Sequence, residues 1–298
     1  MPRSSRSARP TGPTRPGARR RLPVLAALAA ATALVAGATA PAYAADPAPL
    51  APAPTTEHRP AFHPDRDFAG STVAAHEGRT PGSPPALLDA AQTPGLDVAS
   101  YQGNVDWTTT AANGAQFAYV KATEGTSYTN PYFAQQYNGS YNAGLIRGAY
   151  HFALPDHSSG TAQANWFVDH GGGWSADGAT LPPALDIEYN PYGASCYGLS
   201  QSAMVGWIRD FSNTVLNRTG RYPTIYTTTN WWSGCTGNYG GFGATNPLWI
   251  ARYSSTAGTL PNGWGYQTFW QYSDSGTFPG DQDLFNGAAD RLSALALG

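Results

Sequence analysis

The sequence predicts an α/β barrel that follows an export signal and a proline-rich linker. Two observations indicate the barrel: eight short, nearly continuous apolar segments recur after residue 94, and helical patterns separate the early ones. The aromatic residues indicate its extent, because all nine tryptophans and 16 of the 17 tyrosines fall in the same span. That span, 95–298, is long enough for one domain with a substantial core.

The chain begins with the pattern of an export signal. An arginine-bearing stretch ends in three arginines at 19–21, an apolar run follows over 22–40, and Ala-Tyr-Ala at 42–44 matches a small-residue cleavage site. We interpret 1–44 as a signal peptide of a secreted, extracellular protein, with the mature chain beginning at Ala45. The paired arginines leave a twin-arginine export route open. No stretch is long and apolar enough for a confident membrane span, so we expect no membrane anchor.

Residues 45–94 have a different composition from the rest. They hold ten of the 25 prolines, few large apolar residues and no periodicity. Such a composition buries too little apolar surface to offset the entropy of ordering the chain. We interpret this stretch as a linker or disordered arm, and we expect its removal to leave a folded, active domain.

The eight apolar segments are the predicted strands, because near-continuous apolarity is typical of strands buried on both faces. They begin at residues 95, 117, 145, 183, 223, 247, 268 and 283. Helical patterns lie over 130–142, 160–170 and 200–217, whereas 254–266 and 273–280 are too short or too rich in glycine and serine. The pattern predicts a barrel that begins as β/α repeats and ends as strands joined by loops.

The charge of the mature chain argues against nucleic acid as a partner. Seven of the 17 basic residues and none of the 19 acidic residues precede Ala45, which leaves ten basic against 19 acidic groups, formally −9. A nucleic-acid binder needs clustered lysine and arginine to displace counterions from phosphates. Lys121 is the single lysine, and no basic run follows the signal. We expect no nucleic-acid binding.

Several familiar catalytic patterns are absent from the sequence. There is no Gly-x-Ser-x-Gly elbow for a serine hydrolase, and His76-Glu77 lacks the second histidine of a zinc-protease helix because Thr80 stands there. The glycines at 241 and 243 lack the third glycine of a dinucleotide fingerprint. The remaining histidines have no compact ligand spacing. We therefore expect neither a metal nor a cofactor.

The strongest chemical signal is a pair of carboxylates in Leu-Pro-Pro-Ala-Leu-Asp-Ile-Glu-Tyr at 181–189. Side chains alternate along a strand, so Asp186 and Glu188 project to the same side with Cα atoms about 6.6 Å apart. Two carboxyls this close do not both ionise freely, and the more buried one keeps its proton. A neutral acid beside an ionised one is the arrangement that protonates a glycosidic oxygen while stabilising an oxocarbenium-like sugar. The residues alone leave open a solvated loop with two surface acids.

Six blocks in the span from Gly95 to the C-terminus resemble, in order, those of glycoside hydrolase family 25, the Chalaropsis-type lysozymes. The blocks are GLDVASYQGNVDW, FAYVKATEGTSYTNPYF, GLIRGAYHFA, LPPALDIEY, GYQTFWQYSDSG and GDQDLFNG. The resemblance implies a TIM-like barrel of the (β/α)5(β)3 type. It also implies a muramidase that hydrolyses the β-1,4 bond between N-acetylmuramic acid and N-acetylglucosamine in peptidoglycan.

The resemblance also implies roles for four acids. Glu188 would be the general acid, and Asp186 would stabilise positive charge or orient the acetamido group of the substrate. Asp97 and Asp281 would complete an acidic cluster at the barrel mouth. Whether the acetamido group, a carboxylate or water attacks stays open, and we favour retention with substrate assistance.

Aromatic residues near strand ends are candidates for stacking on sugar rings, with the hydrophobic core as the alternative for each. They are Tyr101, Tyr150, Tyr189, Tyr226 and Trp270. Glu124 is either a neighbour of the site or a loop carboxylate that holds Lys121, and it is left out of the catalytic set.

Only two cysteines occur, Cys196 and Cys235, and an exported chain meets an oxidising compartment. We expect a disulfide that ties the loop after the catalytic strand to the loop after the strand at 223. Two free buried thiols are the alternative.

Two other functions compete with a lysozyme. A chitinase-like glycosidase would carry more aspartates before the glutamate, where this chain has Pro182, Pro183 and Ala184. A catalytically silent cell-wall-binding domain would be expected to lack one of the four acids, and all four are present. The expected partner is the glycan strand of peptidoglycan, bound by a monomer.

Overall fold

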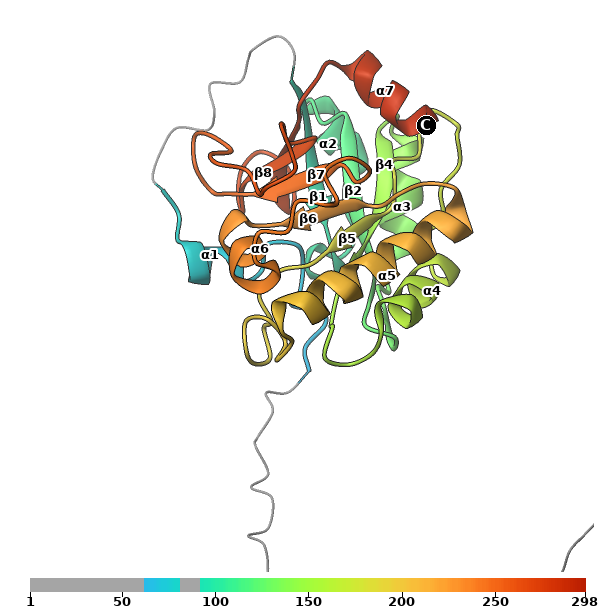
Figure 1. The fold of residues 1–298 in the computed structure, drawn as a ribbon. Helices are drawn as coiled ribbons and strands as arrows, with labels where there is room; N and C mark the ends of the chain where they lie inside the picture. The colour runs from blue at the N-terminus through green and yellow to red at the C-terminus, as the bar shows by residue number, and fades with distance from the viewer. Residues whose placement is uncertain (1–61, 81–91) are drawn as a thin grey trace, which may run out of the picture. The chain divides into compact units, whose positions relative to one another are not determined.

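The structure is a computed structural model that describes residues 62–80 and 92–298 (Figure 1). The predicted signal peptide at 1–44 and the predicted start at Ala45 lie outside the described residues. No described helix combines the length and the apolar character that crossing a membrane requires.

Eight strands of the described chain close into a barrel. They are β1 (Thr93–Val98), β2 (Phe117–Glu124), β4 (Ile146–Phe152), β5 (Ala184–Asp186), β6 (Thr224–Thr227), β7 (Leu248–Ala251), β8 (Phe269–Ser273) and β9 (Asp281–Phe285). The strands from β1 to β8 run parallel, and β9 is antiparallel to both of its neighbours, β1 and β8. Pairing of β1 with β2 closes the ring. The short β3 (Tyr128–Thr129) pairs with the end of β2 outside this ring. The eight predicted strands are confirmed.

Helices follow the first five barrel strands in turn. They are α2 (Trp107–Ala112), α3 (Phe133–Asn142), α4 (Gly160–Asp169), α5 (Gln201–Thr219) and α6 (Thr229–Thr236). Between β7, β8 and β9 the described chain has loops, so the (β/α)5(β)3 barrel is confirmed. A 3-10 turn (Ser100–Gln102) follows β1, α1 (Val73–Glu77) precedes the barrel, and α7 (Ala289–Leu297) follows it.

The sequence determines both ends of α5, the longest helix described. The Ser200 hydroxyl accepts a hydrogen bond from the backbone N–H of Ala203, a side-chain cap that satisfies a free donor of the first turn. Gly220 adopts the left-handed conformation at φ +77° and ends the helix. Between these ends, the residues at helical spacing are buried; they are Met204, Val205, Trp207, Ile208, Phe211 and Val215.

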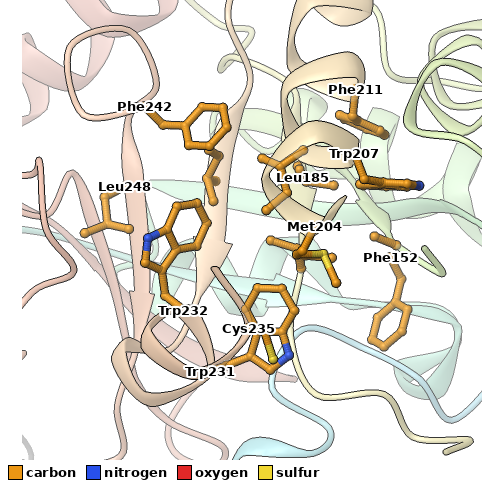
Figure 2. Close-up of a cluster of buried hydrophobic side chains, with 14 of the residues drawn as sticks. Phe152, Leu185, Met204, Trp207, Phe211, Trp231, Trp232, Cys235, Phe242 and Leu248 are labelled. Carbon is orange, nitrogen blue, oxygen red and sulfur yellow. The ribbon is translucent and has the colours of Figure 1, made fainter. Parts of the chain in front are cut away.

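Side chains along each strand alternate between the barrel interior and the layer under the helices. Leu185 of β5 lies in the outer layer, in a core that includes Trp207 and Phe211 of α5 (Figure 2). Ala184 lies in the interior core, with residues such as Tyr150. Asp186 therefore faces the interior of the barrel at the end of β5.

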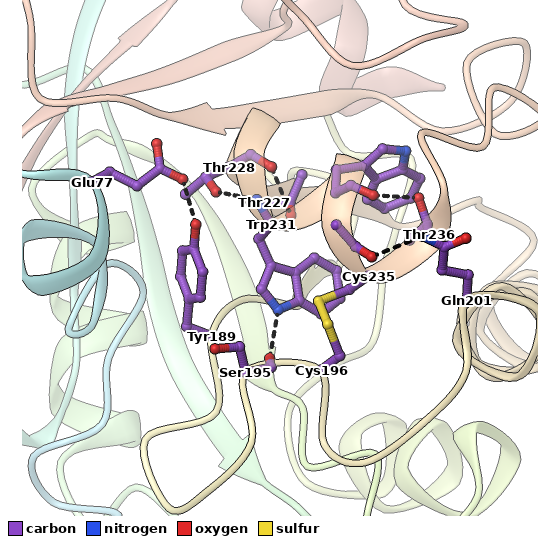
Figure 3. Close-up of a disulfide and its surroundings, with 12 residues drawn as sticks. Glu77, Tyr189, Ser195, Cys196, Gln201, Thr227, Thr228, Trp231, Cys235 and Thr236 are labelled. Carbon is purple, nitrogen blue, oxygen red and sulfur yellow. Dashed lines mark hydrogen bonds between the residues drawn. A yellow bond between two sulfur atoms is a disulfide. The ribbon is translucent and has the colours of Figure 1, made fainter.

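Cys196 and Cys235 form the predicted disulfide, with Cα atoms 5.3 Å apart (Figure 3). Cys196 lies in the loop between β5 and α5, but Cys235 lies within α6 rather than in the predicted loop after the strand at 223. The indole N–H of Trp231 donates to the carbonyl of Ser195 at 2.9 Å. Together these contacts fasten α6 to the loop that follows the carboxylate strand.

Residues 62–80, called the N-terminal segment below, differ from the predicted linker. They contain α1, and Ala69 and Val73 are fully buried in the interior core of the barrel. These few small side chains pack among residues of the barrel, so the segment needs no periodic apolar pattern to be buried. The linker or disordered-arm interpretation of 45–94 is wrong for this segment. The first strand also begins at Thr93, two residues before the predicted boundary.

Candidate functional site

Asp186 and Glu188 lie at the mouth of the barrel, where the parallel strands end. Asp186 is paired with Phe152 of β4 and Tyr226 of β6. The next residue, Ile187, donates its backbone N–H to the carbonyl of Tyr226 at 3.0 Å and packs in the outer core. Its two neighbours therefore turn to the opposite face, and both are buried.

Both side-chain oxygens of Glu188 accept hydrogen bonds from the N-terminal segment. The backbone N–H of Gly70 lies 2.7 Å from Oε1, and the hydroxyl of Thr72 lies 2.5 Å from Oε2. Burial raises the pKa of Glu188 to about 8, although these two hydrogen bonds oppose the rise. A carboxyl with this pKa holds a proton at neutral pH.

The carboxyl group of Asp186 has no hydrogen-bond partner among the described residues, although both of its oxygens are buried. Burial first, and then the charge of Glu188, raise the pKa of Asp186 well above its usual range. A buried polar group without a hydrogen-bond partner destabilises the folded protein. The arrangement therefore favours a hydrogen-bond donor that a ligand brings to Asp186.

Asp97 and Asp281 complete the cluster from the neighbouring strands β1 and β9, where they stand directly opposite each other. The side-chain amide of Gln271 lies 2.7 Å from Asp97 Oδ2 and 3.0 Å from Asp281 Oδ2. Burial raises the pKa of Asp97 to about 7 and that of Asp281 well above its usual range. The charges of Asp97 and Glu188 raise the pKa of Asp281 further. The structure thus brings the four predicted acids together.

Three further residues of the cluster are not among the predicted ones. Asp283 is buried on β9 and accepts a hydrogen bond from the Trp249 indole at 2.8 Å, and the Tyr253 hydroxyl lies 3.4 Å from Asp281 Oδ2. Gln271 is the third. The alternation that pairs Asp186 with Glu188 also pairs Asp281 with Asp283, so that signal is present in the sequence.

Of the five predicted sugar-stacking aromatics, Tyr150 and Tyr226 are fully buried in the interior core, the alternative stated for each, whereas Tyr101 and Tyr189 are more accessible. Tyr150 accepts the backbone N–H of Ala69 at 3.2 Å, and Tyr226 donates to Gln271 Oε1 at 2.8 Å. Tyr189 donates to Glu77 at 3.0 Å (Figure 3). Tyr101 is 67% exposed and lies 5.6 Å from the ring of Phe68.

Trp270 lies on the face of its strand that points away from the barrel interior. It is buried in the outer core, where its indole N–H donates to the carbonyl of Arg252 at 2.9 Å. Successive residues of β8 point to opposite faces, so the neighbouring Gln271 reaches the acids instead. The sequence does not reveal which of these neighbours faces inward.

Glu124 holds Lys121, one of the two roles expected for it. Lys121 Nζ donates to Glu124 Oε2 at 2.5 Å, and both side chains are fully buried. Burial raises the pKa of Glu124 to about 8, and the charge of Lys121 opposes the rise. Lys121 Nζ also donates to the carbonyl oxygens of Pro64, at 3.1 Å, and Asp67. This ion pair therefore also anchors the N-terminal segment.

Residues 96–281 match the model of the glycosyl hydrolases family 25, which is more than half of the chain. The chain belongs to this family. This family 25 hydrolase is 46% identical over 257 residues to "Lysozyme M1" of Streptomyces globisporus, covering 84% of this chain and 86% of the relative. It is 51% identical over 208 residues to "N,O-diacetylmuramidase" of Chalaropsis sp., covering 68% of this chain and 99% of the relative.

Among solved structures, the family 25 hydrolase resembles the muramidase from Acremonium alcalophilum. The two share 59% sequence identity with a TM-score of 0.68, over 69% of this chain and 99% of the other. The family resemblance predicted from the six sequence blocks is confirmed. The matched range 96–281 includes all four predicted acids.

Proposed function

We propose that the chain is a secreted lysozyme that hydrolyses the β-1,4 bond between N-acetylmuramic acid and N-acetylglucosamine in bacterial peptidoglycan. The observation that carries this proposal is Glu188, a buried acid whose pKa of about 8 keeps it protonated beside Asp186. The names of the relatives, a lysozyme and a diacetylmuramidase, support the same substrate class.

In this mechanism Glu188 gives its proton to the glycosidic oxygen while the bond from that oxygen to the anomeric carbon breaks. The unpartnered carboxyl of Asp186 accepts the N–H of the substrate's acetamido group. That contact directs the acetamido oxygen to the anomeric carbon and stabilises the positive charge that develops there. Water then attacks the same carbon while the bond from that carbon to the acetamido oxygen breaks, and the Glu188 carboxylate takes a proton from this water, which restores the enzyme.

Asp97 and Asp281 act through the electrostatic field of the mouth. Beyond the effect of burial, the charge of Asp97 raises the pKa of both Asp186 and Glu188, and the charge of Asp281 raises the pKa of Asp283. The raised pKa helps to keep a proton on Glu188, the proposed proton donor. Tyr101 and Tyr189, the less buried aromatics of the mouth, offer ring faces to sugars.

We also propose that the chain is exported through the signal at 1–44 and acts as a monomer without a membrane anchor. The formal charge of −9 after the signal supports the absence of nucleic acid among its partners. The proposed hydrolysis uses water and carboxyl groups, so it needs no cofactor.

Digestion of purified peptidoglycan tests the proposal. Because the N-terminal segment contacts Glu188, the assay uses the exported chain both intact and cut at a recognition site for a sequence-specific protease placed between Thr80 and Gln92. New reducing ends should be N-acetylmuramic acid. Reducing ends of N-acetylglucosamine, or turnover of chitin alone, would favour the chitinase-like alternative. Wall binding without any new reducing end would favour the silent binding domain.

Substitution of Glu188 by glutamine should abolish most of the turnover. Glu188→Gln keeps the shape of the side chain but removes the transferable proton, so release of reducing ends by the cut form should fall about 10²- to 10⁴-fold. The exposed Asp210 gives a matched acid-to-amide control, Asp210→Asn, which should retain wild-type turnover. A folded Glu188→Gln enzyme with near wild-type turnover would refute the role of Glu188.

A further inference from the structure

The N-terminal segment lies in the acidic mouth described above, where it contacts Glu188, Gln271 and three tyrosines, Tyr150, Tyr189 and Tyr253. Two of its residues occupy the centre: Ala69 contacts Tyr150 through its N–H, and its carbonyl accepts from Gln271 at 2.8 Å. The carbonyl of Gly70 lies 3.2 Å from the Tyr253 hydroxyl. Ala69 is completely buried there. A sugar ring and this backbone cannot occupy the same space.

The far end of the segment covers a second part of the mouth. The ring of His76 stacks on that of Tyr189, with centroids 4.0 Å apart and planes 4° from parallel. Glu77 accepts hydrogen bonds from Tyr189 at 3.0 Å and from Asn230 of α6 at 3.2 Å, and Figure 1 shows α1 beside α6. A flat ring on Tyr189 takes the position that a stacked sugar would take.

The segment also engages both carboxyl oxygens of Glu188, the proposed general acid. A general acid must present an O–H to the leaving oxygen, but here both Glu188 oxygens face donors, the Gly70 N–H and the Thr72 hydroxyl. These contacts hold the carboxyl group against the segment, so its proton cannot reach a glycosidic oxygen. Occupation of the mouth and loss of the acid function therefore come from three residues of one short stretch, Ala69, Gly70 and Thr72.

The fit depends on a glycine at position 70. Gly70 has φ +93°, in the left-handed region, and a Cβ added there would meet the Tyr253 hydroxyl and stand 2.6 Å from Gln271 Oε1. Gly78 is a natural comparison, since its φ is +75° and an added Cβ would meet nothing within 4 Å.

We propose that the N-terminal segment, residues 62–80, is a built-in inhibitor that occupies the substrate cleft of the barrel and keeps the intact chain inactive until the segment leaves. The inference rests on the proposed function. The extent of the relatives agrees with it. The solved Acremonium alcalophilum muramidase is matched over 99% of its length by 69% of this chain, about the share from Gln92 to Gly298. The match to Lysozyme M1 covers 84% of this chain and so must include residues before the barrel.

The first test weakens the segment within the intact chain. Gly70→Ala should raise the rate of reducing-end release from peptidoglycan at least tenfold, toward the rate of the cut form, because the added methyl group cannot fit against Tyr253 and Gln271. Gly78→Ala imposes a comparable backbone strain without the clash, so it should leave the low rate of the intact chain unchanged. Equal rates for the intact wild-type chain and the cut form would overturn the proposal.

The second test restores the inhibitor from outside. A synthetic peptide of residues 62–80 should bind the cut, separated enzyme in a calorimetric titration and lower its turnover as the peptide saturates it. The same peptide with Gly70→Ala should bind at least tenfold more weakly. A peptide that does not bind, or that binds without lowering turnover, would overturn the proposal.

The two tests separate this inference from the proposed function. If neither the intact nor the cut form hydrolyses peptidoglycan, the proposed function fails. Peptide binding that depends on Gly70 would then still show that the segment occupies the mouth, and its absence would refute that as well.

Discussion

Single carboxyl groups dominate the mouth of this barrel. Asp97, Asp186, Glu188, Asp281 and Asp283 are all buried, and burial is the largest cause of the raised pKa of each. Most of them have hydrogen-bond donors within the protein, and Asp186 alone among these five lacks one in the described chain. The donors to Glu188, the proposed proton donor, come from the N-terminal segment, whereas the proposed substrate-orienting Asp186 is left for a donor that a ligand brings.

The two roles predict different responses to the leaving group of the substrate. An aryl glycoside with a good leaving group needs no proton, so it should restore much of the turnover of Glu188→Gln. The same substrate should restore Asp186→Asn far less, because the contact to the acetamido group and the charge beside the anomeric carbon are still missing. Steady-state kinetics of both variants in the cut form, on peptidoglycan and on the aryl glycoside, make the comparison. Equal rescue of both variants would contradict the division of roles.

At the scale of elements, the sequence pattern is sufficient to predict the long helix but not the shortest helices of the barrel. The long helix α5 was predictable because six buried residues recur at helical spacing between Ser200 and Gly220. The short α2 and α6 were not predicted. In α6, Trp231, Trp232 and Cys235 are buried by packing against the barrel and the neighbouring loop, so its helix depends on contacts rather than on a long periodic run.

The disulfide links the loop after the carboxylate strand β5 to helix α6. Cys196 and Cys235 are 39 residues apart, and closing a loop of that length stabilises a chain by about 3 to 4 kcal/mol in the chain-entropy model. Cys196→Ser with Cys235→Ser should lower the free energy of unfolding by about that amount, measured by urea denaturation. The Glu188 pair of hydrogen bonds lies outside this loop, so the site should survive in the folded fraction. Free-thiol titration of the denatured, unreduced wild type should find no reactive thiol, and two reactive thiols would contradict the bond.

At the scale of the whole molecule, residues distant in sequence build both the interior core and the site. Gly70 and Glu188 are 118 residues apart, and Asp97 and Gln271 are 174 apart. The family-like blocks predicted the barrel and the four acids because each block carries its own signal. The N-terminal segment has no such signal in the sequence. Its small apolar residues Ala69 and Val73 are buried only through contacts with the folded barrel.

The acidic mouth also predicts how the stability of the intact chain depends on pH. The pKa of Glu188 is raised from 4.5 to about 8, and that of Asp97 from 3.8 to about 7. Between the unfolded and the folded values, the folded chain binds protons that the unfolded chain has lost, so the contribution of these groups is complete below about pH 4 and falls as the pH rises to about 8. Because each pKa unit corresponds to about 1.4 kcal/mol, the loss at one such carboxyl is on the order of a few kcal/mol.

Glu188→Gln isolates this contribution, because glutamine does not titrate. The variant loses one of the two acceptor oxygens that face Gly70 and Thr72, an effect that does not change with pH, so the slope of stability against pH is the informative quantity. Relative to the wild type, Glu188→Gln should gain stability steadily from pH 4 to pH 8, as measured by the free energy of unfolding in urea. Asp210→Asn, a change at an exposed acid, should follow the wild-type slope. Parallel curves for the wild type and Glu188→Gln would mean that Glu188 ionises in the folded chain as it does in the unfolded one, and the carboxyl would then not hold the proton that the proposed mechanism requires.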